Sequence, residues 1–132
     1  MAGEQIRVGL VGCGNIGAGG HLPAYAHIPE AELVAVCDAV GELAHAAAER
    51  SGAAAYTDYR RLLEREDVEM VDICVPTYLH AEIAIAAMGV GKHVLCEKPM
   101  AHTLEAADAM IEAAQANGVK LMIGQVRRFD HR

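Results

Sequence analysis

A glycine-rich segment near the start of the chain, GCGNIG at Gly12–Gly17, has the spacing of a turn that binds phosphates. It follows an apolar run over 6–11 that is typical of a buried strand. The first glycine permits a tight bend, the second lets backbone approach a pyrophosphate, and the third lets a helix pack on the strand. Free amides at the start of that helix supply the positive charge that two phosphates require. The candidate cofactor-binding residues of this turn are Gly12, Gly14, Asn15, Ile16 and Gly17.

An acid stands at the end of the second apolar run, where Asp38 lies 21 residues after Gly17. Its carboxylate can accept hydrogen bonds from both hydroxyls of an adenosine ribose, whereas a 2′-phosphate would face its negative charge. Ala39 and Val40 offer no cation to offset that charge. The sequence therefore favours NAD over NADP as the cofactor. Asp38 can also cap the next helix, and this role is compatible with binding a ribose. A different ligand, S-adenosylmethionine, is an alternative for a glycine-rich turn followed by an acid.

A second group of reactive residues, Glu97-Lys98-Pro99, follows a short apolar run over 93–96. In an open α/β sheet this place lies at the carboxyl edge, where ligands bind. Lys98 is then the candidate catalytic residue, because it would lie near an oxidised nicotinamide, whose positive charge disfavours a second cation and favours proton transfer. Pro99 restricts the backbone that presents the lysine. Taken alone, a lysine in a loop is more often solvated charge.

The elements that must position these residues alternate between strand and helix. Strands are expected over 6–11, 32–38, 53–56, 70–75, 93–96 and 120–123. Helices are expected after the glycine-rich turn and over 42–50, 79–88 and 104–117, the last capped by Thr103 and ended by Gly118. Such alternation requires a mainly parallel sheet. The predicted fold class is α/β, a doubly wound parallel sheet (Rossmann fold) in a single domain over 1–124, with 125–132 forming no further element.

Composition sets outer limits on function. The chain has 132 residues, 53% of them hydrophobic, and 11 basic against 18 acidic residues give a net charge of −7. That charge argues against nucleic acid and anionic membranes as partners. No secretory signal and no apolar stretch of membrane-spanning length is visible, so a cytoplasmic protein with four reduced, mostly buried thiols is expected.

Other catalytic patterns are weaker. His80-Ala-Glu82 fits half of a zinc deaminase signature, but the P-C-x-x-C half is missing. No histidine pair has zinc-binding helix spacing, no metal is expected, and surface or capping roles suffice for His21 and His27. The sole serine, Ser51, is not in a nucleophile elbow.

The chain resembles the glucose–fructose oxidoreductase/inositol dehydrogenase/MocA family over nearly its whole length. The resemblance rests on four motifs in this order: Gly12–Gly17, Asp38, Pro76–His80 and Glu97–Pro99. The resemblance implies a first domain that binds NAD or NADP. Lys98 matches a lysine that contacts cofactor and substrate, and Glu97 would orient it or line the nicotinamide site. The loop residues implied beside the cofactor are Pro76, Thr77 and His80, although His80 fits better a role in capping or packing the following helix. Val75 departs from the family, which often has a small hydroxyl residue there.

The resemblance also implies a second, substrate-binding domain, and 125–132 would begin the connection to it. Neither His102 nor His131 matches the histidine or aspartate that this second domain usually supplies. The expected reaction moves hydride between a sugar, inositol or related polyol and NAD(P), with cofactor binding but no efficient turnover by this chain alone. A stand-alone dinucleotide-binding module, either a redox sensor or a subunit of a split enzyme, is the alternative. Apolar surface left by a missing partner domain predicts a homo-oligomer.

Overall fold

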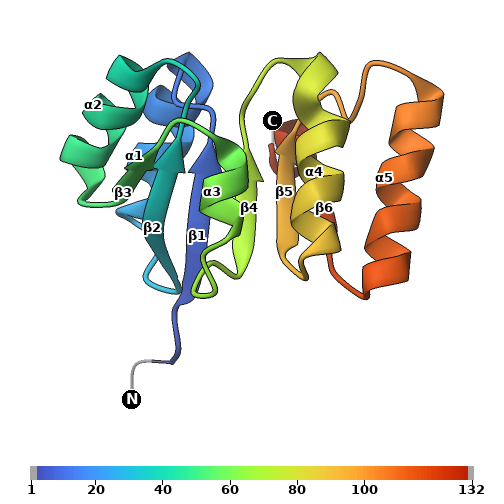
Figure 1. Ribbon diagram of the computed structural model, residues 1–132, viewed down its shortest axis with the longest axis horizontal. Coiled ribbons are helices and arrows are strands. Elements are labelled where there is room, and N and C mark those ends of the chain that lie inside the picture. Colours follow the sequence, from blue (N-terminus) through green and yellow to red (C-terminus); the bar gives the residue numbers. More distant parts are fainter. Residues whose placement is uncertain (1–2, 131–132) are drawn as a thin grey trace.

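The computed structural model describes residues 3–130, so His131 lies outside the described residues. Six strands form one sheet, with their carboxyl ends at the upper edge in Figure 1. The strands are β1 (Ile6–Val11), β2 (Ala31–Cys37), β3 (Ala54–Tyr56), β4 (Met70–Ile73), β5 (His93–Glu97) and β6 (Leu121–Gly124). Each predicted strand is present, with ends that differ by up to two residues from the expected ones.

The helices occupy the connections between the strands. They are η1 (Gly17–His21), α1 (Leu22–Tyr25), α2 (Gly41–Ser51), α3 (Tyr59–Leu63), η2 (Thr77–Leu79), α4 (His80–Gly89), α5 (Leu104–Asn117) and η3 (Val126–Phe129). The Thr103 hydroxyl accepts the N–H of Ala106 at 3.0 Å and caps α5, which ends at Gly118 in the left-handed region, as predicted. Among the described residues no helix has the length and apolar character needed to cross a membrane.

The sheet is parallel throughout and has the strand order β3-β2-β1-β4-β5-β6. This is the order of the Rossmann fold and confirms the predicted fold class. The chain leaves β1 toward β2 and β3, then crosses back and leaves β4 toward β5 and β6. The change of direction opens a crevice between the carboxyl ends of β1 and β4, where ligands bind in sheets of this kind.

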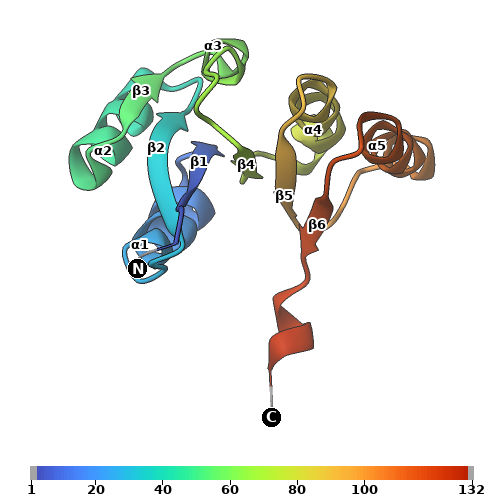
Figure 2. The ribbon, with the colours of Figure 1, turned by 90° about the horizontal axis from the view of Figure 1, so that it is seen from below.

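Helices lie on both faces of the sheet, and each face has its own core (Figure 2). On one face α3, α4 and α5 bury residues that include Leu62, Ile73 and Met88. On the other face the first helical segment and α2 bury Leu10, Leu22 and Val36. Here the helices cover β1 to β3, whereas β5 and β6 have no helix over them.

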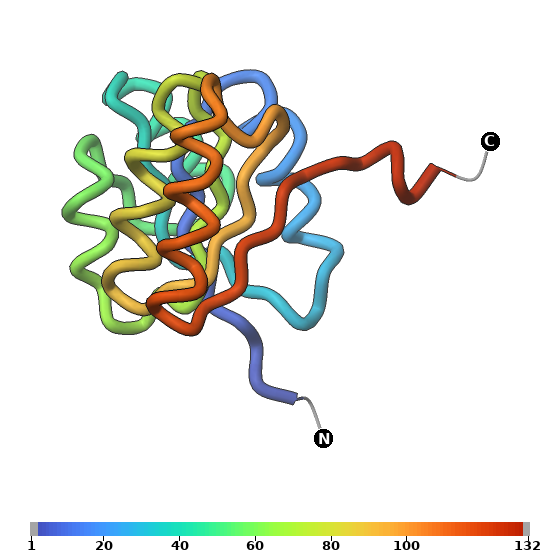
Figure 3. The backbone as a smooth tube through the Cα atoms, turned by 90° about the vertical axis from the view of Figure 1, so that its right-hand side faces the viewer, coloured from blue at the N-terminus to red at the C-terminus, as the bar shows by residue number. Residues whose placement is uncertain are grey.

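Three local features differ from the sequence predictions. The short helix α3 was not expected; the Asp58 carboxylate caps it by accepting the N–H of Arg60 at 3.0 Å. The first helical segment contains a π-helical stretch, η1, ahead of α1. Residues after 124 were expected to form no element, but Val126–Phe129 form a 3-10 turn that extends away from the body of the protein (Figure 3).

Candidate functional site

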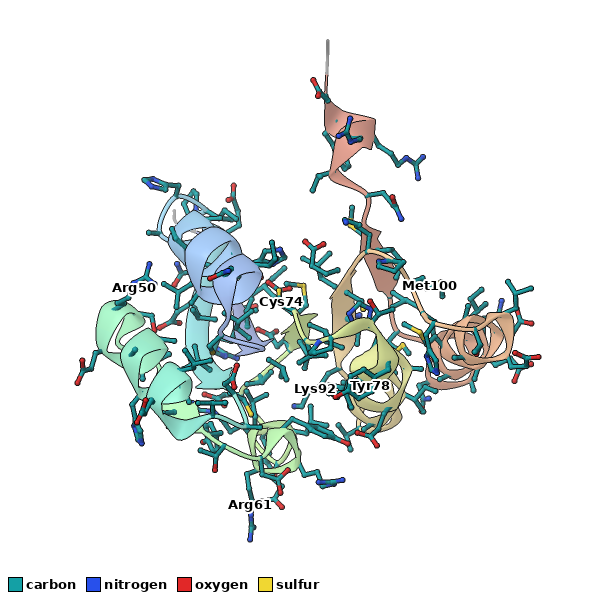
Figure 4. The ribbon with its side chains drawn as sticks, turned by 90° about the horizontal axis from the view of Figure 1, so that it is seen from above. Arg50, Arg61, Cys74, Tyr78, Lys92 and Met100 are labelled. Atoms are coloured by element: carbon teal, nitrogen blue, oxygen red, sulfur yellow. The ribbon has the colours of Figure 1, made fainter. Side chains whose placement is uncertain are left out.

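The loops that follow β1 and β4 come into close contact at the carboxyl edge. Gly12 has a φ of +101°, and a Cβ atom there would lie 2.5 Å from the carbonyl carbon and oxygen of Cys74. Only glycine fits this position, because both the backbone conformation and the space exclude a side chain. Figure 4 views this edge from above, with Cys74 between the first helical segment and α4. The glycine-rich turn therefore lies at the crevice between β1 and β4.

The other two glycines of the motif have different surroundings. A Cβ atom on Gly17 would lie 1.8 Å from the carbonyl oxygen of Gly12, so the helix rests directly on the turn. Gly14 has no atom within 4 Å of a Cβ position, so its backbone faces open space. Helical structure begins at Asn15, and the first amides of a helix have no partner within it. Gly14, Asn15 and Ile16 are all exposed, which leaves backbone donors accessible to a phosphate.

Asp38 is tied to the same turn. One carboxylate oxygen accepts the N–H of Cys13 at 2.8 Å, and the other accepts the N–H of Val40 at 2.8 Å. The side chain thus joins the glycine-rich turn to the start of α2. Each carboxylate oxygen has a second lone pair, so Asp38 can still accept hydrogen bonds from ribose hydroxyls.

A cavity of about 170 Å³ lies between the loops after β4 and β5. It brings together six residues singled out from the sequence, in addition to Cys74 and Val75. The six are Ile16, Pro76, Thr77, His80, Glu97 and Lys98. The first turn of the first helix, the Pro76–His80 segment and the Glu97–Lys98 segment therefore share one concave surface.

His80 holds two walls of this cavity together. Its side chain is buried, with Nδ1 2.9 Å from the carbonyl oxygen of Pro99 and Nε2 2.9 Å from that of Val75. Both ring nitrogens therefore face backbone oxygens of the two loops. This environment agrees with the packing role considered for His80, and its contact with a cofactor stays a prediction.

Glu97 and Lys98 differ in exposure. The Glu97 side chain is 18% exposed, and its Oε2 accepts the backbone N–H of Lys98 at 3.1 Å. The residue Lys98 is exposed at the mouth of the cavity, and its peptide bond to Pro99 is cis. The carboxylate of Glu97 is thus fixed by the backbone of the residue whose side-chain amine can take part in proton transfer.

His21 belongs to this site, and the expectation of a surface or capping role for it is wrong. Its Nδ1 lies 2.7 Å from Asp72 Oδ2 and its Nε2 lies 2.8 Å from Glu97 Oε1. The Tyr25 hydroxyl donates to the same Asp72 oxygen at 2.8 Å. The available signal was Asp72 itself: an acid inside an apolar strand requires a cation, because burial of an unpaired carboxylate is costly.

The surroundings of His21 favour its charged form. The hydrogen bond to Asp72, with smaller contributions from the Asp72 charge and from Glu97, outweighs burial and raises the pKa of His21 to about 9. At neutral pH an imidazolium thus lies between two carboxylates. Burial, with the Asp72 charge next, raises the pKa of Tyr25 far above its ordinary range, so that hydroxyl stays protonated.

Among residues 3–130, His21, Asp72 and Cys74 form a group that could in principle hold a metal ion. Their possible metal-ligand atoms lie within 4.8 Å of one another. The cluster is closed by its own hydrogen bonds: His21 and Tyr25 donate to Asp72, and the Cys74 thiol lies 3.7 Å from the other Asp72 oxygen. Both ring nitrogens of His21 face carboxylates, and a metal ion would have to displace a proton from the ring to bind there. The arrangement is therefore that of an ion-pair network.

The four cysteines are free thiols, as expected, and three are buried while Cys74 is half-buried. Burial raises the pKa of Cys13 to about 11 and those of Cys37 and Cys96 to about 12. Thiols of this kind are poor nucleophiles at neutral pH, because the reactive form is the thiolate.

A larger hollow, about 720 Å³, lies at the opposite edge of the sheet and is lined by charged residues that include Arg65 and Lys92. Its cations are already engaged. Arg65 pairs with Asp67 at 2.7 Å, and the Lys92 ammonium donates to the carbonyl oxygens of Arg65 and Val68 at 2.7 Å each. Although this hollow is larger, its paired cations are not available to bind an anionic ligand. The carboxyl edge is therefore the better candidate site.

A parallel sheet in this strand order, with a glycine-rich turn at the crevice and an acid after the second strand, defines a Rossmann domain of the dinucleotide-binding class. Residues 6–125 match the model of an oxidoreductase family with an NAD-binding Rossmann fold, Gfo/Idh/MocA. The chain belongs to this family, which confirms the resemblance drawn from its motifs.

Curated relatives include inositol 2-dehydrogenase of Salmonella paratyphi B, 41% identical over 129 residues that cover 95% of this chain and 38% of the relative. Levoglucosan dehydrogenase of Pseudarthrobacter phenanthrenivorans is 40% identical over 129 residues and is matched over 33% of its length, with 91% of this chain covered. The chain thus spans little more than a third of these relatives.

Solved structures with the same fold contain nicotinamide cofactors of both kinds. The WlbA dehydrogenase of Bordetella pertussis in complex with NADH and UDP-GlcNAcA has a TM-score of 0.92 and 35% identity, with 98% of this chain and 37% of that one covered. A 3-ketoreductase of Actinomadura kijaniata in complex with NADP and TDP-benzene has a TM-score of 0.87 and 34% identity, with 96% and 41% covered.

Proposed function

We propose that this chain binds NAD at its carboxyl edge and is the cofactor-binding domain of an oxidoreductase that acts on a sugar or polyol hydroxyl. The observation that carries the proposal is the convergence of three loops: the open backbone at Gly14, the Asp38 carboxylate and the cavity beside Lys98. Relatives of this chain carry the names of dehydrogenases for inositol and levoglucosan, which supports this substrate class.

The residues present fit a dinucleotide. The amides of Gly14, Asn15 and Ile16 would hold the pyrophosphate, because Gly14 is open and Gly17 brings the helix N-terminus against the turn. Asp38 would accept the ribose hydroxyls. Thr77 and Glu97 would line the nicotinamide end of the site. When bound, the nicotinamide supplies the hydride chemistry that no side chain can.

The chain's own contribution to the reaction is proton handling and orientation. The Lys98 amine is accessible at the mouth of the cavity and would take up or return the proton of the substrate hydroxyl. Glu97, fixed by the backbone N–H of Lys98, would orient that amine. The 170 Å³ cavity is smaller than the roughly 300–1,000 Å³ of most small-molecule sites, so other residues of the whole protein would complete the substrate pocket.

The choice between NAD and NADP is expected to depend on Asp38. We expect NADH to bind at least about tenfold more tightly than NADPH, because a 2′-phosphate would face a carboxylate with no cation beside it. Asp38→Asn keeps an acceptor for the N–H of Cys13 but removes the negative charge. It should therefore bring the affinities for NADH and NADPH closer together. Titration of both cofactors, followed by nicotinamide fluorescence, measures the ratio of the two affinities.

Asp108→Asn is the matched control, because Asp108 is an exposed acid on α5, which lies at the opposite end of the sheet from β2 and Asp38 (Figure 1). It should leave both affinities unchanged. Equal affinity of the wild-type chain for the two cofactors would refute the assignment to Asp38, and no saturable binding of either would refute the proposed function.

A further inference from the structure

His21 joins three separate parts of the chain. It belongs to the first helical segment, its Nδ1 donates to Asp72 of β4, and its Nε2 donates to Glu97 of β5. The two carboxylates come from neighbouring strands and would repel each other without the cation between them. His21 therefore determines how close the Glu97 side chain lies to the interior of the protein.

The backbone is shaped to bring His21 to this position. Gly17–His21 form a π-helical stretch, and the N–H of Leu22 donates to the carbonyl oxygen of Gly17, five residues earlier. A π turn adds one residue to a helix and changes the direction in which later side chains point, and such turns are frequent at functional sites. The glycines at 19 and 20 place no side chains next to the ring.

The interior end of the network is closed. Asp72 is completely buried and is held by His21, the Tyr25 hydroxyl and the Cys74 thiol. Burial and the Asp72 charge raise the pKa values of Tyr25 and Cys74 well above their ordinary ranges. Because the Tyr25 hydroxyl and the Cys74 thiol stay protonated and both donate to Asp72, the network holds Asp72, and with it His21, in place.

The outer end faces the cavity. Glu97 Oε1 accepts the hydrogen bond from His21, Oε2 accepts the backbone N–H of Lys98, and the side chain lines the cavity with Ile16 and Thr77. Gly124 of β6 leaves room beside it, since a Cβ atom there would lie 3.4 Å from Oε1. Each oxygen of Glu97 therefore has one fixed donor.

We propose that His21 is a positioning residue of the nicotinamide site: clamped on buried Asp72, it fixes the Glu97 carboxylate and, through it, the backbone of Lys98. This inference rests on the proposed function, because the nicotinamide site is part of that function. The coupling of His21 to the backbone of Lys98 is a property of the protein without cofactor. The charged or titratable groups that face His21 are Tyr25 of α1, Asp72 of β4, Cys74 in the loop directly after β4, and Glu97 of β5.

The coupling is tested by nuclear magnetic resonance on the ¹⁵N-labelled chain without cofactor. The signal of the Lys98 amide should shift with pH along the same curve as the ring protons of His21, with a midpoint near the pKa of about 9. His21→Gln should abolish that transition, and His27→Gln, which alters an exposed histidine near the same helix, should retain it. A Lys98 signal that does not follow His21 in the wild-type chain overturns the proposal even if the variant fails to fold.

A second readout connects the coupling to the cofactor. His21→Gln should weaken NADH binding at pH 7 about tenfold, which corresponds to about 1.4 kcal/mol, the size of one hydrogen bond that no longer orients the site. His27→Gln should not weaken NADH binding. Unchanged affinity in a folded His21→Gln variant contradicts the positioning role. If the wild-type chain binds no NADH while Lys98 still follows His21, the proposed function fails and the structural coupling stands.

Discussion

Alanine at position 17 is expected to damage both the fold and the binding of NADH. The new Cβ atom would lie 1.8 Å from the carbonyl oxygen of Gly12, a backbone atom that cannot move aside as a flexible side chain can. The helix must therefore lift from the turn. We expect Gly17→Ala to lower the free energy of unfolding by about 3 kcal/mol, the range of severe overpacking. NADH affinity should fall more than about a hundredfold, because the helix N-terminus leaves its place.

Gly14→Ala separates binding from folding. No atom lies within 4 Å of a Cβ position at Gly14, so stability should stay within about 0.5 kcal/mol of wild type. NADH affinity should still fall about tenfold or more, because the methyl group occupies the space through which a pyrophosphate approaches. Gly89→Ala is the control, because Gly89 is an equally open position on α4. It should change the free energy of unfolding by no more than the helix preference of alanine, about 1 kcal/mol, and it should leave NADH affinity unchanged.

Urea unfolding and NADH titration of the three variants measure these effects. A Gly14→Ala chain that binds NADH as tightly as the Gly89→Ala chain would show that the turn does not face the cofactor. A Gly17→Ala chain of wild-type stability would show that the helix does not rest on Gly12.

Stability should decrease with pH in a window set by His21. Its pKa is raised from 6.5 in the unfolded chain to about 9 in the folded protein. Between these values the folded state keeps a proton that the unfolded state has lost. The stabilisation from His21 is therefore complete below pH 6.5 and is lost as the pH rises toward 9. From pH 6.5 to 8.0 the wild-type chain should lose about 1.6 kcal/mol, because the slope rises toward about 1.4 kcal/mol per pH unit only where the unfolded histidine has lost its proton.

His21→Gln is the comparison that isolates this effect. It should be less stable than wild type at pH 6.5, by about 3 kcal/mol, because the buried Asp72 loses its cation. Its stability should then change little up to pH 8.0. The window ends below the ordinary pKa of the thiols, whose raised values would otherwise add a loss of the same sign. Parallel pH profiles for the two proteins, measured by urea unfolding, would contradict the ion-pair network.

Local residue patterns were sufficient to predict the fold and much of the candidate site. The run over 6–11, the glycines of the turn and Asp38 lie within the first third of the chain, and their places at the carboxyl edge follow from backbone geometry that each segment sets for itself. The caps at Thr103 and Gly118 were predictable for the same reason. The right-handed crossovers that parallel strands require then restrict the strand orders that such a sheet can adopt.

What the sequence did not reveal depends on contacts between distant residues. His21 and Glu97 are 76 positions apart, and nothing near either one indicates that a π turn will bring them together. His80 is a similar case, because its partners are two loop carbonyls that meet only in the folded protein. Asp72 in an apolar strand was a visible signal that a buried cation was needed, but it did not identify the partner.

Binding of the dinucleotide at the carboxyl edge is tested most directly by nuclear magnetic resonance on the ¹⁵N-labelled chain, with NADH as the added ligand. Saturable shifts should be largest at the amides of Gly14, Asn15 and Ile16, with further shifts at Thr77 and Lys98. The larger hollow at the opposite edge, around Gly91 and Lys92, should be unaffected. Shifts centred on that hollow, or no saturable shifts, would contradict binding of the dinucleotide at the carboxyl edge.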